Sequence, residues 1–180
     1  MPFGPPLISN VSPFGALPPM DYYNGYTPQE RNRKLRASYK IFPNHSHPYY
    51  KGACHMCGDP NSPVEPHSED YEEPYLWERP AEYAVCKTCH GRLHKRFKSP
   101  HAWEAYKRHL RRGGYGSDLK EPRVSREILS LSKSLESTGG GSSFSLSPLP
   151  QLRQPSSPDA WWESLSIDPE ALTGSWARPR

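Results

Sequence analysis

Two Cys-x-x-Cys pairs constrain the fold of this chain more than any other feature of its sequence. Cys54 and Cys57 form the first pair, and Cys86 and Cys89 form the second. Each pair can present two sulfurs to one tetrahedral Zn²⁺, and Gly58 permits the tight turn that the first pair needs. Four free cysteines or two disulfides fit this spacing less well. We therefore expect a structural zinc ion that supplies much of the folding energy of a small domain.

The composition indicates that the folded part is small and lies in the middle of the chain. Of the 180 residues, 22 are proline, 13 are glycine and only 34% are hydrophobic, so little of the chain can form a core. No apolar stretch is long enough to span a bilayer, and the start lacks the pattern of a signal peptide. This predicts a soluble, cytoplasmic protein. The expected divisions are a disordered arm over residues 1–26, a zinc-binding domain over 27–116, a weak amphipathic helix over 117–136 and a low-complexity tail over 137–180.

Local signals predict helices on both sides of the cysteine-rich segment. Thr27 and Glu30 have the spacing of a capping box, which predicts the start of a helix that Pro43 would end. The residues between the two cysteine pairs show no helical periodicity, so short strands and turns are expected there. Apolar spacing predicts two further helices over residues 89–97 and 99–112. The predicted fold class is therefore small α+β.

Histidines and basic residues accompany the second cysteine pair. His90 follows Cys89 directly, and His94 lies four residues later on the same predicted helix, so the two imidazoles face one way and can share a cation. His94 alone would be a surface residue, but together with His67 and the cysteines it favours a second metal site. Basic blocks flank an acidic segment around this region. They suit a phosphate-binding face, although basic helices can also be simply solvated.

The stretches CHMCG, EPHSEDYEEP and CKTCHGRLH together resemble the HNH (ββα-metal) endonucleases, in particular their zinc-stapled bacterial and phage type. The resemblance covers residues 54–97, and Asp70, Tyr71 and Pro74 set its register. It implies a ββα-metal core, stabilised by zinc and flanked by helices and long disordered tails. It also implies a separate catalytic ion, Mg²⁺ or another divalent metal, DNA as the partner, entry into the minor groove, and a bacterial or phage-encoded protein.

The resemblance assigns roles to single residues, with one departure. Ser68 stands where the family has its general base, and a serine cannot hold that proton near neutral pH. Either the metal cradle survives without efficient catalysis, or a shifted turn makes His67 the base. Glu69 is a third candidate base, and His90 is the remaining candidate catalytic residue. The candidate ligands of the catalytic ion are His67, His90, His94 and Asp70.

Two further groups of residues are candidates for binding. In a nuclease, basic side chains after the second cysteine pair would bind neighbouring phosphates without contributing base specificity. These are Arg92, Lys95, Arg96 and Lys98. The tail contains hydrophobic islands that either dock on a protein partner or pack back onto the domain. These islands contain Trp161, Trp162, Leu165, Leu172 and Trp176.

The function expected from these features is metal-dependent hydrolysis of phosphodiester bonds in DNA by an HNH-type endonuclease. The alternative is a catalytically weak or inactive HNH-like zinc module that binds nucleic acid or acts as an adaptor. A third possibility is a module for protein interaction alone, with the tryptophan-containing tail as its working end. Cleavage of a plasmid in the presence of divalent metal separates the first from the others.

Overall fold

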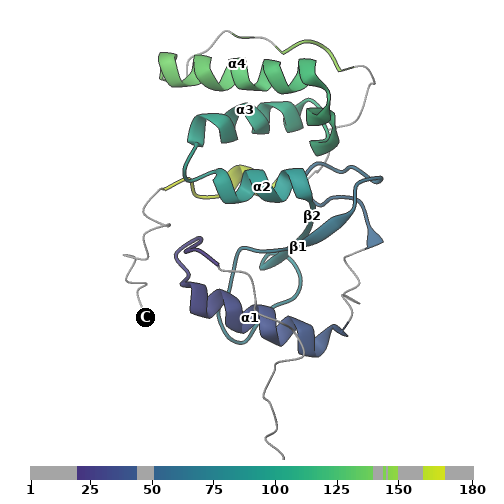
Figure 1. Ribbon diagram of the computed structural model, residues 1–180, viewed down its shortest axis with the longest axis vertical. Coiled ribbons are helices and arrows are strands. Elements are labelled where there is room, and N and C mark those ends of the chain that lie inside the picture. Colours follow the sequence, from purple (N-terminus) through teal and green to yellow (C-terminus); the bar gives the residue numbers. More distant parts are fainter. Residues whose placement is uncertain (1–19, 44–50, 140–143, 145, 150–159, 169–180) are drawn as a thin grey trace, which may run out of the picture.

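The computed structural model of the protein describes residues 20–43, 51–139, 144, 146–149 and 160–168. Figure 1 shows α2, α3 and α4 as successive layers on one side of a two-stranded sheet, with α1 on its other side. The small α+β class is therefore confirmed. The elements are α1 (Pro28–Ile41), β1 (Val64–Ser68), β2 (Glu82–Cys86), α2 (Lys87–Lys95), α3 (Pro100–Arg111), η3 (Gly116–Lys120), α4 (Pro122–Thr138) and η4 (Trp161–Ser164).

Helix α1 begins with the capping box that the sequence predicts. The Thr27 hydroxyl accepts from the Glu30 amide at 3.2 Å, and the Glu30 carboxylate accepts from the Thr27 amide at 2.7 Å, so two otherwise unpaired amides are satisfied. The buried residues of this helix are Arg31 and Lys34. Because both are cationic, α1 turns a charged face inward, and this face does not join the hydrophobic core.

The two strands place the cysteines and histidines on neighbouring elements. β1 and β2 pair antiparallel, with Val64 opposite Cys86 and Ser68 opposite Glu82. Every residue of β2 is buried. β2 runs directly into α2, with Cys86 as the N-cap residue of the helix. The second cysteine pair therefore spans a strand–helix junction, and α2 carries the histidines that follow it.

The buried hydrophobic residues of the described chain form two large clusters and a small third one, in which Tyr23 meets Phe97. The first surrounds the cysteines and includes Met56, Val85, Leu93, Trp103, Tyr106, Leu110 and Trp162. The second lies between α3 and α4 and consists of Ala105, Val124, Ile128, Leu131 and Leu135. The segment that was expected to form a weak helix after residue 116 is thus packed on α3, because its apolar residues recur every three or four positions and form one stripe.

Both ends of the described chain pack on this core. Within the expected disordered arm, Tyr23 and Tyr26 exchange backbone hydrogen bonds of 3.1 and 2.9 Å and close a turn. Near the other end, Trp162 is buried in the core and Trp161 stacks on Tyr83 at 3.5 Å between ring centroids. These two tryptophans therefore pack back onto the domain. Leu172 and Trp176 lie outside the described residues.

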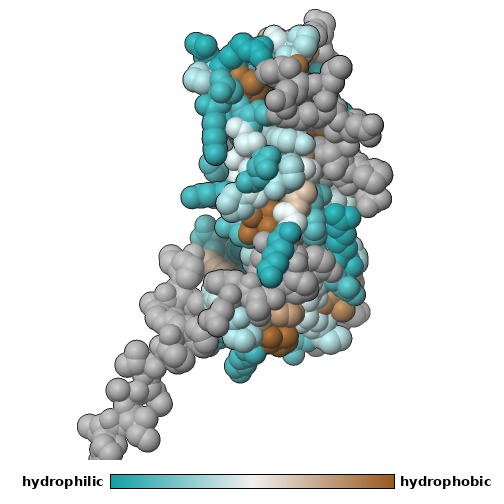
Figure 2. All heavy atoms as spheres, turned by 90° about the vertical axis from the view of Figure 1, so that its right-hand side faces the viewer, coloured by the Kyte–Doolittle hydropathy of each residue, from teal (hydrophilic) through white to brown (hydrophobic). Residues whose placement is uncertain are grey.

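Figure 2 shows one face on which hydrophilic residues dominate and hydrophobic residues gather only in small, separate patches. Among the described residues, none of the helices has both the length and the apolar character needed to cross a bilayer.

Candidate metal centres

The four cysteines come together at the junction of the first knuckle, β2 and α2. Their sulfurs all lie within 4.8 Å of one another, which is the spacing of ligands around one ion. In the first knuckle the Gly58 amide donates to the Cys54 carbonyl at 2.8 Å, and Gly58 has a positive φ of 72°, as its position predicted. The Cys86 amide donates to the Cys54 sulfur at 3.2 Å. This arrangement could hold a structural metal ion such as zinc.

The four-cysteine cluster is closed. All four residues are buried, and each has a relative exposure of at most 2%. The Tyr106 hydroxyl lies 3.2 Å from the Cys89 sulfur. Gly116 packs so closely that an added Cβ would stand 2.8 Å from the Cys86 sulfur. Hydrophobic residues and a glycine backbone thus surround the cluster, which leaves no open ligand position of the kind that a catalytic zinc site requires.

The thiols of the cluster perturb one another. A hydrogen bond from Cys57 lowers the pKa of the Cys54 thiol, whereas burial raises the pKa of the Cys89 thiol well above its usual value. Four sulfurs at this distance cannot all ionise unless a cation neutralises them. The donor set therefore fits a soft divalent cation, because metal binding would stabilise the thiolates and release protons.

A second cluster of metal-ligating residues is formed by His67 on β1 and by His90 and His94 on α2. One ring nitrogen from each lies within 4.8 Å of the others. The Nε2 atoms of His90 and His94 are 2.9 Å apart. The spacing of four residues on α2 produces this pair, and the pairing of β1 with β2 brings His67 against it. The structure thus brings together three of the predicted ligands of the catalytic ion.

The orientation of His67 is fixed by Glu69. Nε2 of His67 lies 2.6 Å from Oε1 of Glu69, so it donates to the carboxylate, while Nδ1 is buried without a hydrogen-bond partner among the described residues. Nδ1 is therefore the nitrogen that remains for a cation. Metal-ligating histidines usually donate their other ring nitrogen to a carboxylate. The unpaired buried nitrogen and its carboxylate partner fit a bound divalent ion.

A carboxylate also orients His90, as Glu69 orients His67. His94 stays in the uncharged form. Nδ1 of His90 lies 2.6 Å from Oε1 of Glu65. Burial, assisted by the charges of His67 and His90, lowers the pKa of His94 to about 2. Neutral imidazole is the form that binds metal, so His94 is ready to act as a ligand at neutral pH.

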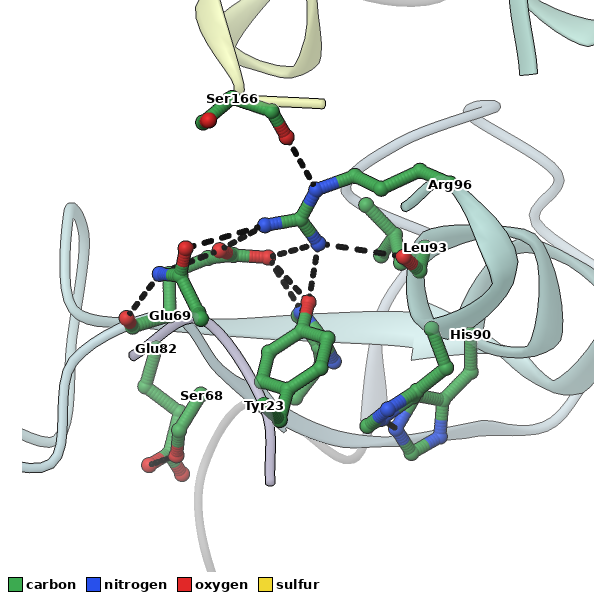
Figure 3. Close-up of polar contacts among 11 residues, drawn as sticks. Tyr23, Ser68, Glu69, Glu82, His90, Leu93, Arg96 and Ser166 are labelled. Atoms are coloured by element: carbon green, nitrogen blue, oxygen red, sulfur yellow. Dashed lines mark hydrogen bonds and ion pairs between the residues drawn. The ribbon is translucent and has the colours of Figure 1, made fainter. Parts of the chain in front are cut away.

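Glu69 lies in a buried network that continues away from the histidines (Figure 3). Arg96 donates to its two carboxylate oxygens at 2.9 and 3.2 Å, and the Tyr23 hydroxyl donates to Oε1 at 2.8 Å. Arg96 also donates to the carbonyl oxygens of Leu93 and Ser166. Burial alone would raise the pKa of Glu69, but the hydrogen bond from His67 and the charge of Arg96 lower it. Glu69 therefore stays ionised and holds His67.

This network places Arg96 differently from the sequence-based expectation. Its side chain is fully buried, so it pairs with Glu69 and does not face solvent as a phosphate-binding residue would. Lys95 and Lys98 are exposed, and both line a cavity that also contains His94. Arg92 stacks its guanidinium over the Tyr106 ring at 5.6 Å. Two of the four predicted cations thus lie beside the histidines.

Two residues of the acidic segment lie apart from the three-histidine cluster. The Asp70 carboxylate accepts from the Tyr26 hydroxyl at 2.5 Å and from the Glu72 amide at 2.9 Å, and Asp70 does not belong to the histidine group. The Ser68 hydroxyl donates to Glu82 at 3.0 Å. Ser68 is not one of the three grouped ligands, but it lines the same cleft as His67, His90 and His94.

Several residues of the site were not identified from the sequence. Glu65 lies two positions before His67 on β1, so strand alternation would have placed both on one face. Tyr23 and Asn24 contact Glu69 from a turn that is far away in the sequence, and no local pattern signals that contact. Arg31 lines the same cavities as His94, and only its place on α1 reveals it.

No protein-family model, curated protein sequence or solved structure matches this chain significantly. The arguments about its function therefore depend on the geometry of the two clusters.

Proposed function

We propose that the chain is a metal-dependent nuclease of the HNH type, in which the four cysteines hold a structural zinc ion and the three histidines hold a catalytic divalent ion. The observation that carries the proposal is the three-histidine cluster, which lines a cleft of about 630 Å³ together with the cationic residues Arg31 and Lys34. A phosphate needs both a metal and cations around it, and this cleft offers both kinds of group.

In this proposal the three histidines bind the catalytic ion and two glutamates orient two of their rings. His67, His90 and His94 would hold the ion, while Glu69 and Glu65 fix the rings of His67 and His90 through their other nitrogens. When bound, a divalent ion would neutralise negative charge at the phosphate and lower the pKa of a water molecule. Three imidazoles without a carboxylate ligand favour a transition metal over Mg²⁺.

A second function, nucleic-acid binding without efficient cleavage, is favoured by the contacts of Ser68 and Glu69, the two expected base positions other than His67. Ser68 donates its proton to Glu82, and Glu69 is occupied by Arg96 and His67. Neither side chain is placed to take a proton from water. A chain of this kind would retain the metal and the phosphate contacts but would lack the proton acceptor of an efficient nuclease.

The experiment that tests the proposal is a nicking assay on supercoiled plasmid with Mg²⁺, Mn²⁺, Ni²⁺ or Zn²⁺. Wild type should nick the plasmid, His94→Ala should lose the activity, and His101→Ala, which changes a histidine of α3 outside the cluster, should keep it. Cleavage only after Ser68→His would support the second function. Equal cleavage by wild type and His94→Ala would contradict the assignment of the cluster.

A further inference from the structure

Two cavities meet beside the three-histidine cluster. The larger, of about 630 Å³, lies between α1 and the elements that carry the histidines, and the smaller has about 370 Å³. Met20, Arg31 and His94 line both cavities, so the two adjoin at these residues. One face of α1 lines the larger cavity, because its lining residues are spaced three or four apart. These are Arg31, Lys34, Leu35, Ser38 and Tyr39.

Arg31 occupies the point where the cavities meet. Its side chain is about nine-tenths buried and lies over the rings of Tyr23 and Tyr71, at 5.1 and 5.5 Å from their centroids. Nη1 donates to the Asp21 carbonyl at 2.6 Å, but the buried Nε has no hydrogen-bond partner among the described residues. An unpaired buried donor is costly. A cationic side chain that lines both cavities beside the three-histidine cluster fits an anionic ligand.

The acidic residues of the larger cavity are already paired, and this leaves Arg31 to face a ligand. Glu82 contacts Lys34 at 3.3 Å, and Glu65 contacts His90 at 2.6 Å. Neither carboxylate has an ion pair with Arg31 among the contacts of the described residues. The polar partners of Arg31 are the Asp21 carbonyl and the Tyr71 side chain, and neither is an anion.

The far ends of the two cavities differ in chemistry. Trp77 lines the larger cavity, where Lys34 lies over its ring at 5.3 Å from the centroid and Phe42 and Tyr75 contact it edge-on at 5.6 and 5.9 Å. The exposed Lys95 and Lys98 line the smaller cavity. The path from Trp77 through Arg31 to the lysines therefore offers an aromatic ring, a buried cation and two solvated cations in succession. Aromatic platforms combined with basic side chains are typical of single-strand binding sites.

We propose that this path binds single-stranded nucleic acid, with a phosphate at Arg31 beside the histidines and an unpaired base against Trp77. The inference rests on the proposed function, since it takes the ligand to be a nucleic acid. His67 has a relative exposure of only 1%, and α1 forms the opposite wall of the cleft. An unpaired strand can enter such a cleft, whereas a duplex brings its second strand with it. The volume of about 630 Å³ is that of a small-ligand site.

The test is fluorescence anisotropy of the full, metal-loaded chain with fluorescein-labelled oligothymidylate, alone and annealed to oligodeoxyadenylate. Wild type should bind the single strand about tenfold tighter than the duplex, because only an unpaired base can stack on Trp77. Trp77→Ala should remove about tenfold of the single-strand affinity and abolish the preference. Equal or tighter binding of the duplex by wild type would overturn the inference and leave the proposed function standing, whereas no binding of either form would overturn both.

Variants of α1 distinguish a direct contact between Arg31 and the nucleic acid from a general effect of positive charge. Arg31→Met should weaken single-strand binding about tenfold or more, because a charge-assisted hydrogen bond is lost, and Arg31→Lys should recover part of the loss. Arg33→Met removes the same charge from the exposed face of α1 and should weaken binding about threefold or less, as expected of a remote, screened charge. Metal content and circular dichroism of each variant show that it is folded. Equal losses for folded Arg31→Met and Arg33→Met would overturn the role of Arg31.

Discussion

The four-cysteine and three-histidine clusters start from the same kind of sequence signal, paired ligands at short spacing, but the fold treats them differently. The cysteines are buried inside the hydrophobic core, where Trp103, Tyr106 and Leu93 close around them. Within the three-histidine cluster only His67 is fully buried, while His90 and His94 are partly exposed and line the cleft. A cluster sealed by apolar residues suits a structural ion, and one that opens to a cleft suits an ion that meets a ligand.

The two clusters also differ in the residues that contact their candidate metal ligands. Around the sulfurs the contacts are backbone amides, a phenol and apolar side chains, whereas His67 and His90 each donate to a carboxylate, Glu69 and Glu65. Carboxylates orient imidazoles and raise their basicity. The half-exposed Glu65 could therefore change without unfolding the chain, whereas Glu69 is part of the buried network and the cysteines are part of the core.

The largest effect should come from removing a cysteine. Cys89→Ala should leave the chain unfolded, because structural zinc contributes roughly 10 kcal/mol or more to folding in small domains. Circular dichroism and limited proteolysis measure the outcome, with His101→Ala as the control that should stay folded. A folded Cys89→Ala protein would contradict the claim that the cysteine cluster, unlike the histidine cluster, is required for folding.

The next largest effect should come from the buried ion pair behind His67. Glu69→Gln leaves the charge of Arg96 buried without its partner, which should cost about 3–5 kcal/mol of unfolding free energy. Glu136→Gln, on the exposed side of α4, serves as the control and should cost less than about 0.5 kcal/mol. Urea denaturation of the zinc-loaded chain gives both values. A cost for Glu69→Gln no larger than that of the control would mean that the network does not hold His67.

A smaller effect, confined to the histidine cluster, should follow from Glu65→Gln. The carboxylate is half exposed, so stability should barely change, but metal affinity at the histidines should fall about tenfold or more. Competition with a coloured metal indicator measures the affinity, and Glu78→Gln, another exposed acid nearby, is the control. Unchanged affinity would show that the contact with His90 does not tune the site.

The smallest effect should come from the C-terminal segment. Glu163 pairs with Arg111 at 2.6 Å and with Lys107 at 3.6 Å on α3, but these contacts are partly solvated. Glu163→Gln should therefore cost less than about 1 kcal/mol and leave metal affinity at both clusters unchanged. Thermal unfolding and metal titration test this. A loss of metal from either cluster would mean that the segment supports a site and not only α3.

The sequence was sufficient for the parts of this architecture that depend on local spacing. The Cys-x-x-Cys turns, the pair His90 and His94 and the capping box of α1 follow from the geometry of short segments. The sequence predicts a solvated cation at Arg96, and only the packing of Tyr23 and Glu69 reveals its burial. Contacts between segments that are distant in the sequence produce no periodic pattern of residues. The sequence therefore does not predict the cleft beside α1.

The most direct test of the central claim is the metal content of the full chain before and after dialysis against a mild chelator, with circular dichroism at each step. The account predicts two metal ions per loaded chain, one for each cluster. The chelator should remove one ion without unfolding, and that ion should be missing from His94→Ala from the start. Loss of both ions together with the fold, or a single ion in both wild type and His94→Ala, would contradict the claim that a closed structural centre and an open, ligand-facing centre lie side by side.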